Sequence, residues 1–260
     1  HNETGLVTRT IRVDVAPYHV TLSPDGKRLA VSCRGGRGAT LSQPNAMSAG
    51  TAVRIDTTTD AALDGSVVVI DTAALRATQT ITGIRQPGKS CFMDDSRTLV
   101  VPGTDDDMLW KVDLTQAEPR PVGLSVAPVS DAGYGHIPTA VTALPNGNIA
   151  VACGGANAIA IVSTRESKVT GYIPTGWYPI AVGVADGKLV VANAKGIGGR
   201  VKRSNGAYNV HGTVGTLQIV GLDAVSGKAL DGNTRQVAIN NRWDLGAAAG
   251  LPARDVAPVP

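Results

Sequence analysis

The repeating pattern in residues 138–176 constrains the fold more than any other feature of the chain. Short apolar runs alternate there with turns rich in Gly, Asn and Pro. The runs are Thr139–Leu144, Ile149–Ala152, Ala158–Val162 and Val169–Ile173. Such runs are typical of antiparallel strands that follow one another in a meander. Four strands in roughly 40 residues make one blade of a β-propeller, so this stretch predicts one complete blade.

The same unit recurs along the chain, and each copy opens at a proline. The openings are Pro17, Pro87, Pro138 and Pro179. The last unit is expected to close with a fourth strand at Thr234–Asn240. No stretch shows a sustained apolar period of 3.6 residues, which an amphipathic helix requires. We therefore predict that the chain is almost entirely β.

The prediction for the whole chain is an all-β protein, a β-propeller with four recognisable four-stranded blades. Asn2–Asp14 is expected to form a turn and the outer strands of a partial N-terminal blade. Residues 1–243 are assigned to this partial propeller as one domain. Residues 244–260 are rich in Ala, Gly and Pro and are assigned to a linker or tail. The sequence opens without Met or a signal peptide, so we expect a processed chain or part of a longer one.

Three long connections interrupt the repeat: Arg34–Asp64, Glu118–Ile137 and Ala194–Gly212. Strands of a blade run up and down, so the loop before the first strand and the loop between the second and third strands share one end. All three long connections are therefore expected at the same end of the propeller. Functional residues concentrate on long loops held by a rigid scaffold, and we place any site at that end.

Composition and charge exclude several classes of function. The net charge is +3 with scattered basic residues, and aromatic residues make up 3% of the chain, which argues against a nucleic-acid surface. No apolar run approaches the length of a membrane span. The three cysteines, Cys33, Cys91 and Cys153, are an odd number, and we expect buried free thiols rather than a disulfide.

Three histidines fall near the predicted loop end: His19, His136 and His211. Each could bind a metal or transfer a proton. Each could equally make a structural hydrogen bond, because no two share the local spacing of a ligand pair. His19, Lys89, His136 and Trp177 are expected around the mouth of the central channel. A stand-alone enzyme with its site at that mouth is therefore one hypothesis.

An acidic run and an aromatic pair add further candidates. Asp105, Asp106 and Asp107 suit a hard cation, or form a solvated acidic turn, because a bound Ca²⁺ needs about six or more oxygen ligands. Trp177 and Tyr178 form either an exposed contact for a partner or a hydrophobic lid between two blades.

A small basic cluster lies in the last long connection, at Arg200, Lys202 and Arg203. It either meets a phosphate or an acidic partner surface or belongs to a solvated loop. The chain contains no Ser–His–Asp order, no H-E-x-x-H motif and no Cys/His cluster. We therefore predict a binding or interaction module, with no catalytic residue and no cofactor of its own.

Several stretches resemble the N-terminal propeller of a two-part bacterial family. Its members carry a propeller of YVTN-type repeats, expected to have about seven blades, followed by a phosphoesterase domain of the alkaline-phosphatase superfamily. The matching stretches are Pro17–Val20, Ser23–Lys27, Thr51–Asp71, Gly171–Pro179, Val190–Gly199 and Thr234–Arg242. The chain departs from the family pattern at Gly103–Met108 and at Val162-Ser163.

The resemblance implies a phosphoesterase domain C-terminal to this propeller, which would hold the divalent metal and the catalytic residues. The propeller would flank that domain and contribute to substrate access or assembly. Such propellers are typically exported, so the resemblance also implies a periplasmic, secreted or cell-surface location. The alternative is a non-enzymatic interaction propeller of the periplasm or cell surface, whose partner is another protein.

Overall fold

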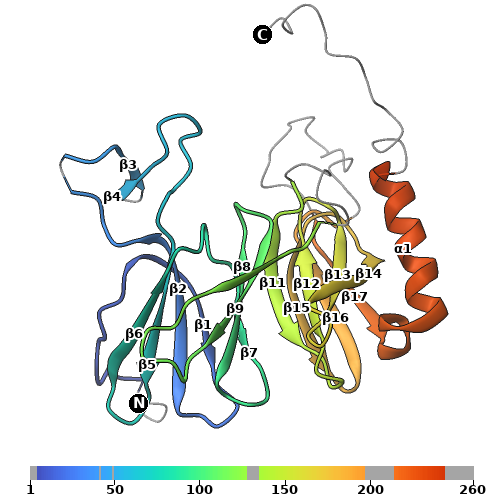
Figure 1. Cartoon of the computed structure of the whole chain (residues 1–260), viewed down its shortest axis with the longest axis horizontal. Helices are drawn as coiled ribbons and strands as arrows, with labels where there is room; N and C mark the ends of the chain where they lie inside the picture. Colours follow the sequence, from blue (N-terminus) through green and yellow to red (C-terminus); the bar gives the residue numbers. More distant parts are fainter. Residues whose placement is uncertain (1–4, 41, 49, 128–134, 197–213, 244–260) are drawn as a thin grey trace, which may run out of the picture.

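The computed structural model describes residues 5–40, 42–48, 50–127, 135–196 and 214–243. These residues form four antiparallel sheets that follow one another in chain order (Figure 1). The sheets are the four blades of a β-propeller, which confirms the predicted all-β fold. No helix among the described residues is long and apolar enough to cross a membrane.

The blades are numbered 1 to 4 along the chain, and the strands of each run in order across its sheet. Blade 1 contains β1 (Val15–Leu22), β2 (Arg28–Gly36), β5 (Ser66–Asp71) and β6 (Arg76–Thr82). Blade 2 contains β7 (Cys91–Phe92), β8 (Thr98–Gly103), β9 (Met108–Asp113) and β10 (Val122–Ser125). Blade 3 contains β11 (Pro138–Ala143), β12 (Ile149–Cys153), β13 (Ala158–Ser163) and β14 (Lys168–Pro174).

Blade 4 has three strands, β15 (Pro179–Ala185), β16 (Lys188–Asn193) and β17 (Thr216–Gly221). A short helix, η1 (Leu222–Val225), and the helix α1 (Gly227–Asn241) follow it. A separate hairpin of β3 (Asn45–Ser48) and β4 (Thr51–Arg54) lies within the long connection between β2 and β5.

Prolines open the first strands because these strands begin irregularly. The pairing of the first two strands shifts register beside Pro17, Pro138 and Pro179. Pro87 makes an isolated bridge to Gly103 at the corresponding place in blade 2. A proline has no N–H to donate and is tolerated at the start of a strand or at a bulge, which explains its recurrence in the sequence.

Blade 3 shows how the repeat builds the core. All residues of β12 and β13 are buried. Ile159 and Ile161 contribute to an apolar cluster with Leu189 and Val191 of blade 4. Val151, which alternates with them across the sheet, belongs to the cluster shared with blade 2. A blade inside the array is therefore apolar on both faces because each face packs on a neighbouring blade.

The C-terminal part differs from the sequence prediction. Thr234–Asn240, predicted as the fourth strand of the last blade, is helical. Leu230 and Val237 are buried, and the helix packs mainly on β14. Thr234 Oγ1 accepts the backbone N–H of Tyr172 at 2.9 Å. The predicted strand is wrong because these side chains meet blade 3 at helical spacing, and blade 4 is left with three strands.

Two further differences lie in segments predicted from weaker patterns. The strands expected in Asn2–Asp14 do not form in its described part, since residues 5–14 contain no strand. Ile11 and Val13 nevertheless pack on the open side of blade 1. The loop Glu118–Ile137 contains the outer strand β10, which is too short to show an alternating pattern.

The connections expected to share one end define the loop-bearing end of the propeller. This end carries residues 37–65, 104–107 and 154–157, which link second to third strands, and the segments that enter the first strands. In Figure 1 the β3–β4 hairpin and the C-terminal end of α1 both lie towards the top, at this end. At the opposite end blades 1 and 3 have short turns, as expected, whereas in blade 2 residues 114–121 connect β9 to β10.

Candidate functional site

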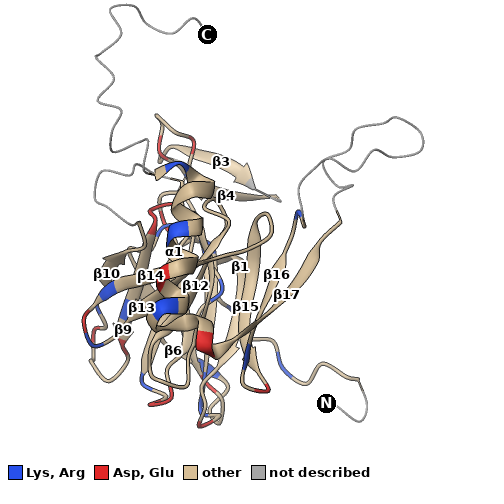
Figure 2. Ribbon diagram, turned by 90° about the vertical axis from the view of Figure 1, so that its right-hand side faces the viewer, with Lys and Arg blue, Asp and Glu red and all other residues tan. Residues whose placement is uncertain are grey.

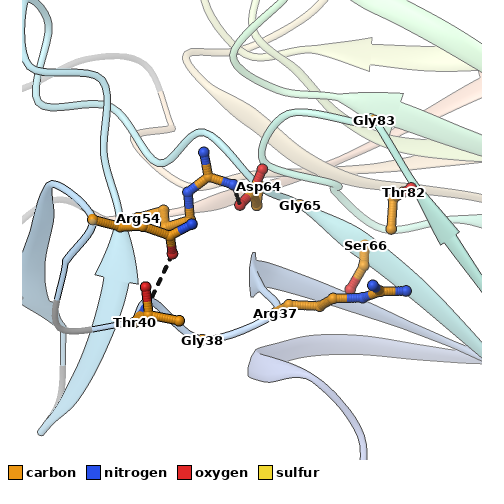
Figure 3. A pocket seen from close by; sticks show the side chains of 10 residues that line it. Arg37, Gly38, Thr40, Arg54, Asp64, Gly65, Ser66, Thr82 and Gly83 are labelled. Carbon is orange, nitrogen blue, oxygen red and sulfur yellow. Dashed lines mark hydrogen bonds and ion pairs between the residues drawn. The ribbon is translucent and has the colours of Figure 1, made fainter.

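A pocket of about 380 Å³ opens between the β3–β4 insertion and blade 1 (Figure 3). It lies at the loop-bearing end. Its lining combines two arginines with hydroxyl groups and glycines: Arg37, Gly38, Thr40, Gln43, Arg54, Asp64, Gly65, Ser66, Thr82 and Gly83. These polar side chains and accessible backbone groups would suit a polar ligand better than an apolar one.

The charges of the pocket are partly compensated from within. Arg54 Nη1 lies 2.7 Å from Asp64 Oδ2, and both side chains are about a third exposed. Ser66 Oγ donates a hydrogen bond of 2.6 Å to Asp14 Oδ2. Arg37 is exposed and makes no ion pair among the described residues. Its guanidinium is therefore free to pair with the carboxylate or phosphate group of a ligand.

Gly65 shapes the wall of this pocket. A Cβ at Gly65 would meet the backbone oxygen of Ile84 and the ring of Pro87. Only glycine therefore allows the end of the insertion to lie this close to the connection between blades 1 and 2. The insertion was predicted to carry function, but which of its side chains face the pocket depends on the hairpin geometry.

Asp107 and His136 form a second polar centre at the loop-bearing end. The Asp107 carboxylate accepts backbone N–H groups from Gly135 at 2.7 Å, His136 at 3.2 Å and Ile137 at 2.7 Å. His136 Nδ1 lies 3.8 Å from Asp107 Oδ2, too far for a hydrogen bond. Burial would raise the pKa of Asp107, but the imidazole and the three N–H donors outweigh burial and lower it.

His136 also helps to anchor the end of α1. Its ring lies 5.6 Å from the Trp243 ring, and Trp243 contacts Tyr172 edge-on at 5.1 Å. Asn241 Nδ2 donates to the backbone oxygen of Ala156 at 2.9 Å. The end of α1 is therefore tied to blade 3 at the loop-bearing end. His136 is 5% exposed, so its ring lies in the interior rather than in an open cleft.

His19 in β1 lies near Lys89, which precedes β7 and makes an isolated bridge to Ala140. Burial and the positive charge of Lys89 lower the pKa of His19. The backbone of Lys89 bridges to blade 3 through hydrogen bonds with Thr139 and Val141. Among the described residues no recorded contact joins this pair to His136 or Trp177. The hypothesis of a site at the channel mouth therefore stays a prediction.

The aromatic pair lies between blades 3 and 4. Trp177 is 53% exposed, which favours the exposed contact over the hydrophobic lid. The backbone N–H of Tyr178 donates to Asn157 Oδ1 at 2.8 Å, and Lys195 Nζ lies 5.0 Å from the Tyr178 ring centre. The pair is held at the loop-bearing end with Trp177 turned to solvent.

The acidic run is divided among separate partners. Asp105 pairs with Arg85 at 3.0 Å, and Asp106 accepts a hydrogen bond from Trp110 Nε1 at 3.0 Å. Asp107 accepts hydrogen bonds from the backbone N–H groups of residues 135–137, as described above. Within the described ranges, no three His, Cys, Asp or Glu side chains gather into a group able to hold a metal ion.

The remaining candidate residues are the basic cluster, His211 and the three cysteines. Arg200, Lys202, Arg203 and His211 lie outside the residues that the structure describes. Cys33, Cys91 and Cys153 are free thiols, as predicted, but Cys91 is partly exposed whereas Cys33 and Cys153 are buried. Burial raises the pKa of Cys153 to about 12, so the thiolate needed for nucleophilic chemistry does not form near neutral pH.

The chain matches no protein-family model and no curated protein. Among solved structures it is similar to Kuenenia stuttgartiensis hydrazine synthase, with a TM-score of 0.55, 20% identity, and coverage of 85% of this chain and 51% of that one. A luciferin-regenerating enzyme gives a TM-score of 0.52 at 15% identity, covering 78% and 60%. The Dos1 propeller gives 0.46 at 14% identity, covering 69% and 40%.

These similarities concern the fold alone, because all three identities are low. The chain spans about half the length of the hydrazine synthase chain, two fifths of the Dos1 propeller and three fifths of the luciferin-regenerating enzyme. The two matches with a TM-score above 0.5 show a shared fold and nothing more.

Proposed function

We propose that this propeller is the binding scaffold of a bacterial metal-dependent phosphoesterase. It lies beside the catalytic domain and contributes to substrate access with its loop-bearing end. The observation that carries the proposal is the shared location of the arginine-lined pocket and the anchored end of α1. A domain that follows α1 would start at the end where the Arg37 pocket opens.

Two features of the chain support a binding role for the propeller and a catalytic role for the other domain. The free guanidinium of Arg37 and the hydroxyl of Thr82 suit the oxygens of a phosphate ester. The described residues offer neither a metal-binding group of side chains nor an activated nucleophile. In this proposal the divalent metal is held by the catalytic domain, and this chain concentrates and orients the anionic substrate. A periplasmic, secreted or cell-surface location fits this role and is part of the proposal.

The experiment uses the protein as isolated from its natural host. Phosphoesterase activity towards p-nitrophenyl phosphate is measured with added divalent metal and after chelation. We expect metal-dependent hydrolysis, and Arg37→Ala should raise KM about tenfold with kcat little changed, as loss of one charged contact predicts. Arg76→Ala, at an exposed arginine that begins β6 at the opposite end, is the matched control and should leave KM unchanged.

The alternative function is a non-enzymatic interaction propeller of the cell envelope. The exposed Trp177, supported by Tyr178 and Lys195, is the observation that favours it, because exposed aromatic residues are frequent anchors of protein interfaces. An isolated native protein without metal-dependent phosphoesterase activity would reject the first proposal. Loss of a co-purifying protein partner on Trp177→Ala would then support the alternative.

A further inference from the structure

A second pocket, of about 370 Å³, lies beside the β3–β4 insertion and is distinct from the Arg37 pocket. The two pockets share no lining residue. Arg54 lines the first, whereas its chain neighbours Val53 and Ile55 line the second. Successive side chains of an extended segment point to opposite faces, so the end of β4 separates the two pockets. We call the second one the Arg34 pocket, after the cation in its lining.

The insertion supplies the apolar wall of the Arg34 pocket, which consists of Ala46, Val53, Ile55 and Ala62. In Figure 2 the β3–β4 hairpin is tan over most of its length, because Arg54 is the only charged residue of these two strands. Ile55 forms a backbone bridge with Ala62. The N–H of Leu63 donates to the backbone oxygen of Arg54 at 3.0 Å. These backbone contacts fix the wall, so a ligand meets a surface that is already formed.

Arg34 and Gln86 form the polar part of the same lining. The guanidinium carbon of Arg34 lies 3.5 Å from the centre of the Tyr18 ring, and this stacking fixes the plane of the N–H donors. Arg34 Nε is buried without a hydrogen-bond partner, and Arg34 makes no ion pair within the part of the chain that the structure describes. A buried N–H group without a partner costs free energy, which an acceptor on a ligand would restore.

The propeller repeat does not require an arginine at this position. In blade 1 the residue that follows the strand partner of the opening proline is Arg34. The equivalent residues of the other blades are short: Thr104, Gly154 and Ala194. Blades therefore fold without a long cationic side chain at this point, and binding of an anion gives Arg34 a role that the repeat does not.

The charges of the lining indicate which anion fits. Among the described residues that line the pocket, Arg34 is the one cation and Asp60 the one acidic residue. A phosphate dianion would meet a single guanidinium and would be repelled by Asp60. A carboxylate carries one charge, and its two oxygens match the fork of one guanidinium. An acid whose hydrocarbon part lies against the apolar wall therefore fits both halves of the pocket.

We propose that the Arg34 pocket binds a small monocarboxylic acid with an apolar body. The carboxylate pairs with Arg34 and accepts a hydrogen bond from the Gln86 amide, while the hydrocarbon part lies against Val53 and Ile55. All lining residues come from residues 16–86, so one stretch of this chain builds the whole pocket. The inference does not rest on the phosphoesterase proposal, because it uses neither the Arg37 pocket nor a metal.

The test is isothermal titration calorimetry of the protein isolated from its natural host, with hexanoate as the probe. We expect a dissociation constant of about 1 mM or lower for so small a ligand. Hexanamide has the same hydrocarbon body without the charge, and it should bind at least about tenfold more weakly. Inorganic phosphate at the same concentration should leave the affinity for hexanoate unchanged.

Arg34→Met isolates the contribution of the charge. It should weaken the binding of hexanoate by about ten- to a hundredfold, as loss of hydrogen bonds to a charged group predicts, and should change the affinity for hexanamide little. Arg76→Met, at an exposed arginine of the opposite end, is the matched control and should leave the affinity for hexanoate unchanged.

Ala62→Leu tests the apolar wall without touching the charge. The larger side chain would fill part of the space beside Ile55, so hexanoate and hexanamide should both bind more weakly. Because Arg34→Met also removes the stacking on Tyr18, circular dichroism and urea unfolding should establish that each variant is folded at the temperature of the titration.

Three results would overturn the proposal. The first is the absence of binding at about 10 mM hexanoate, ten times the expected dissociation constant. The second is equal affinity for hexanoate and hexanamide, which would mean that the carboxylate is not recognised. The third is a folded Arg34→Met variant that binds hexanoate as the wild type does, since the acid would then lie elsewhere.

Discussion

Replacing Asp107 by Ala should destabilise the propeller far more than replacing its neighbour Asp105. Asp107 is 7% exposed, and its carboxylate accepts three backbone N–H groups from residues 135–137. Asp105 makes one ion pair with Arg85, and both side chains are about a third exposed. The two substitutions remove the same group two positions apart in the same loop.

The magnitude follows from the groups left behind. A buried N–H without a partner costs about 1–3 kcal/mol, and hydrogen bonds to charged acceptors are the stronger ones. The N–H of His136 is buried, whereas Gly135 is exposed, so water can replace part of the loss. We expect Asp107→Ala to lower the free energy of unfolding by about 2–4 kcal/mol. Asp105→Ala should cost less than about 1 kcal/mol, as exposed ion pairs do.

The assay is urea unfolding followed by tryptophan fluorescence and circular dichroism, with all variants at one protein concentration. Trp243 packs against His136 and Tyr172, so its emission should report the loosening of this loop. Equal losses for Asp107→Ala and Asp105→Ala would refute the reasoning, because the buried N–H groups would then not depend on the carboxylate.

The pH dependence provides an independent check on Asp107. Its pKa is lowered from the ordinary value of 3.8 in the folded state. A lowered pKa means that the stabilisation is present above the unfolded value and is lost as the pH falls through the folded one. The difference in stability between the wild type and Asp107→Asn should therefore persist at neutral pH and shrink below about pH 4. A difference that grows on acidification would contradict this sign.

Three further predictions concern buried residues. Ile161→Ala should cost about 2–5 kcal/mol, because Ile161 is 0% exposed between blades 3 and 4, whereas Ile239→Ala should change stability by less than about 0.5 kcal/mol; urea unfolding measures both. Gly65→Ala should lower the melting temperature and disturb the pocket, because the added Cβ meets the backbone oxygen of Ile84. Burial raises the pKa of Cys153 to about 12, so a thiol reagent at pH 8 should label it only after denaturant is added.

Much of the fold could be predicted because each blade repeats the same pattern of short apolar runs separated by turn residues. The strands of blade 3 were visible as apolar runs, and the observed β12 and β13 agree with them to within a residue or two. The outer strand β10 was missed since its four residues, Val122–Ser125, are largely exposed. An outer strand contributes little to the core, so its sequence carries little apolar pattern.

The helix α1 was missed for a different physical reason. Its apolar contacts are few, because only Leu230 and Val237 are buried, and two apolar positions seven residues apart are too few to reveal a helical period. The helix can pack in this position because of a glycine in blade 3. A Cβ at Gly171 would lie 2.6 Å from Leu230 Cγ, so glycine at this point of β14 lets α1 approach. Tertiary contact here overrides local sequence preference.

The sequence indicated which end of the propeller carries the candidate site, but not which residues form it. The prediction that long connections share one end led to the insertion that forms the pocket, and Trp177 was recognised as a potential exposed contact. The pairing of Asp107 with residues 135–137 was not foreseen, because about 30 residues of sequence separate them. Such a contact depends on how two blades meet, and no local spacing records it.

The exposed apolar faces, such as that of Leu217 and Ile219 in β17, show that the repeat pattern also reflects contact with a neighbouring sheet. A strand acquires an apolar side where it packs on another sheet, so the match between Ile159–Ile161 and Leu217–Ile219 implies a similar environment for both pairs. For the pair in blade 3 that environment is blade 4. For the pair in blade 4 it must come from outside the four described blades. A soluble monomer gains nothing from an apolar face of this kind, and the same positions would be polar if blade 4 were a true end.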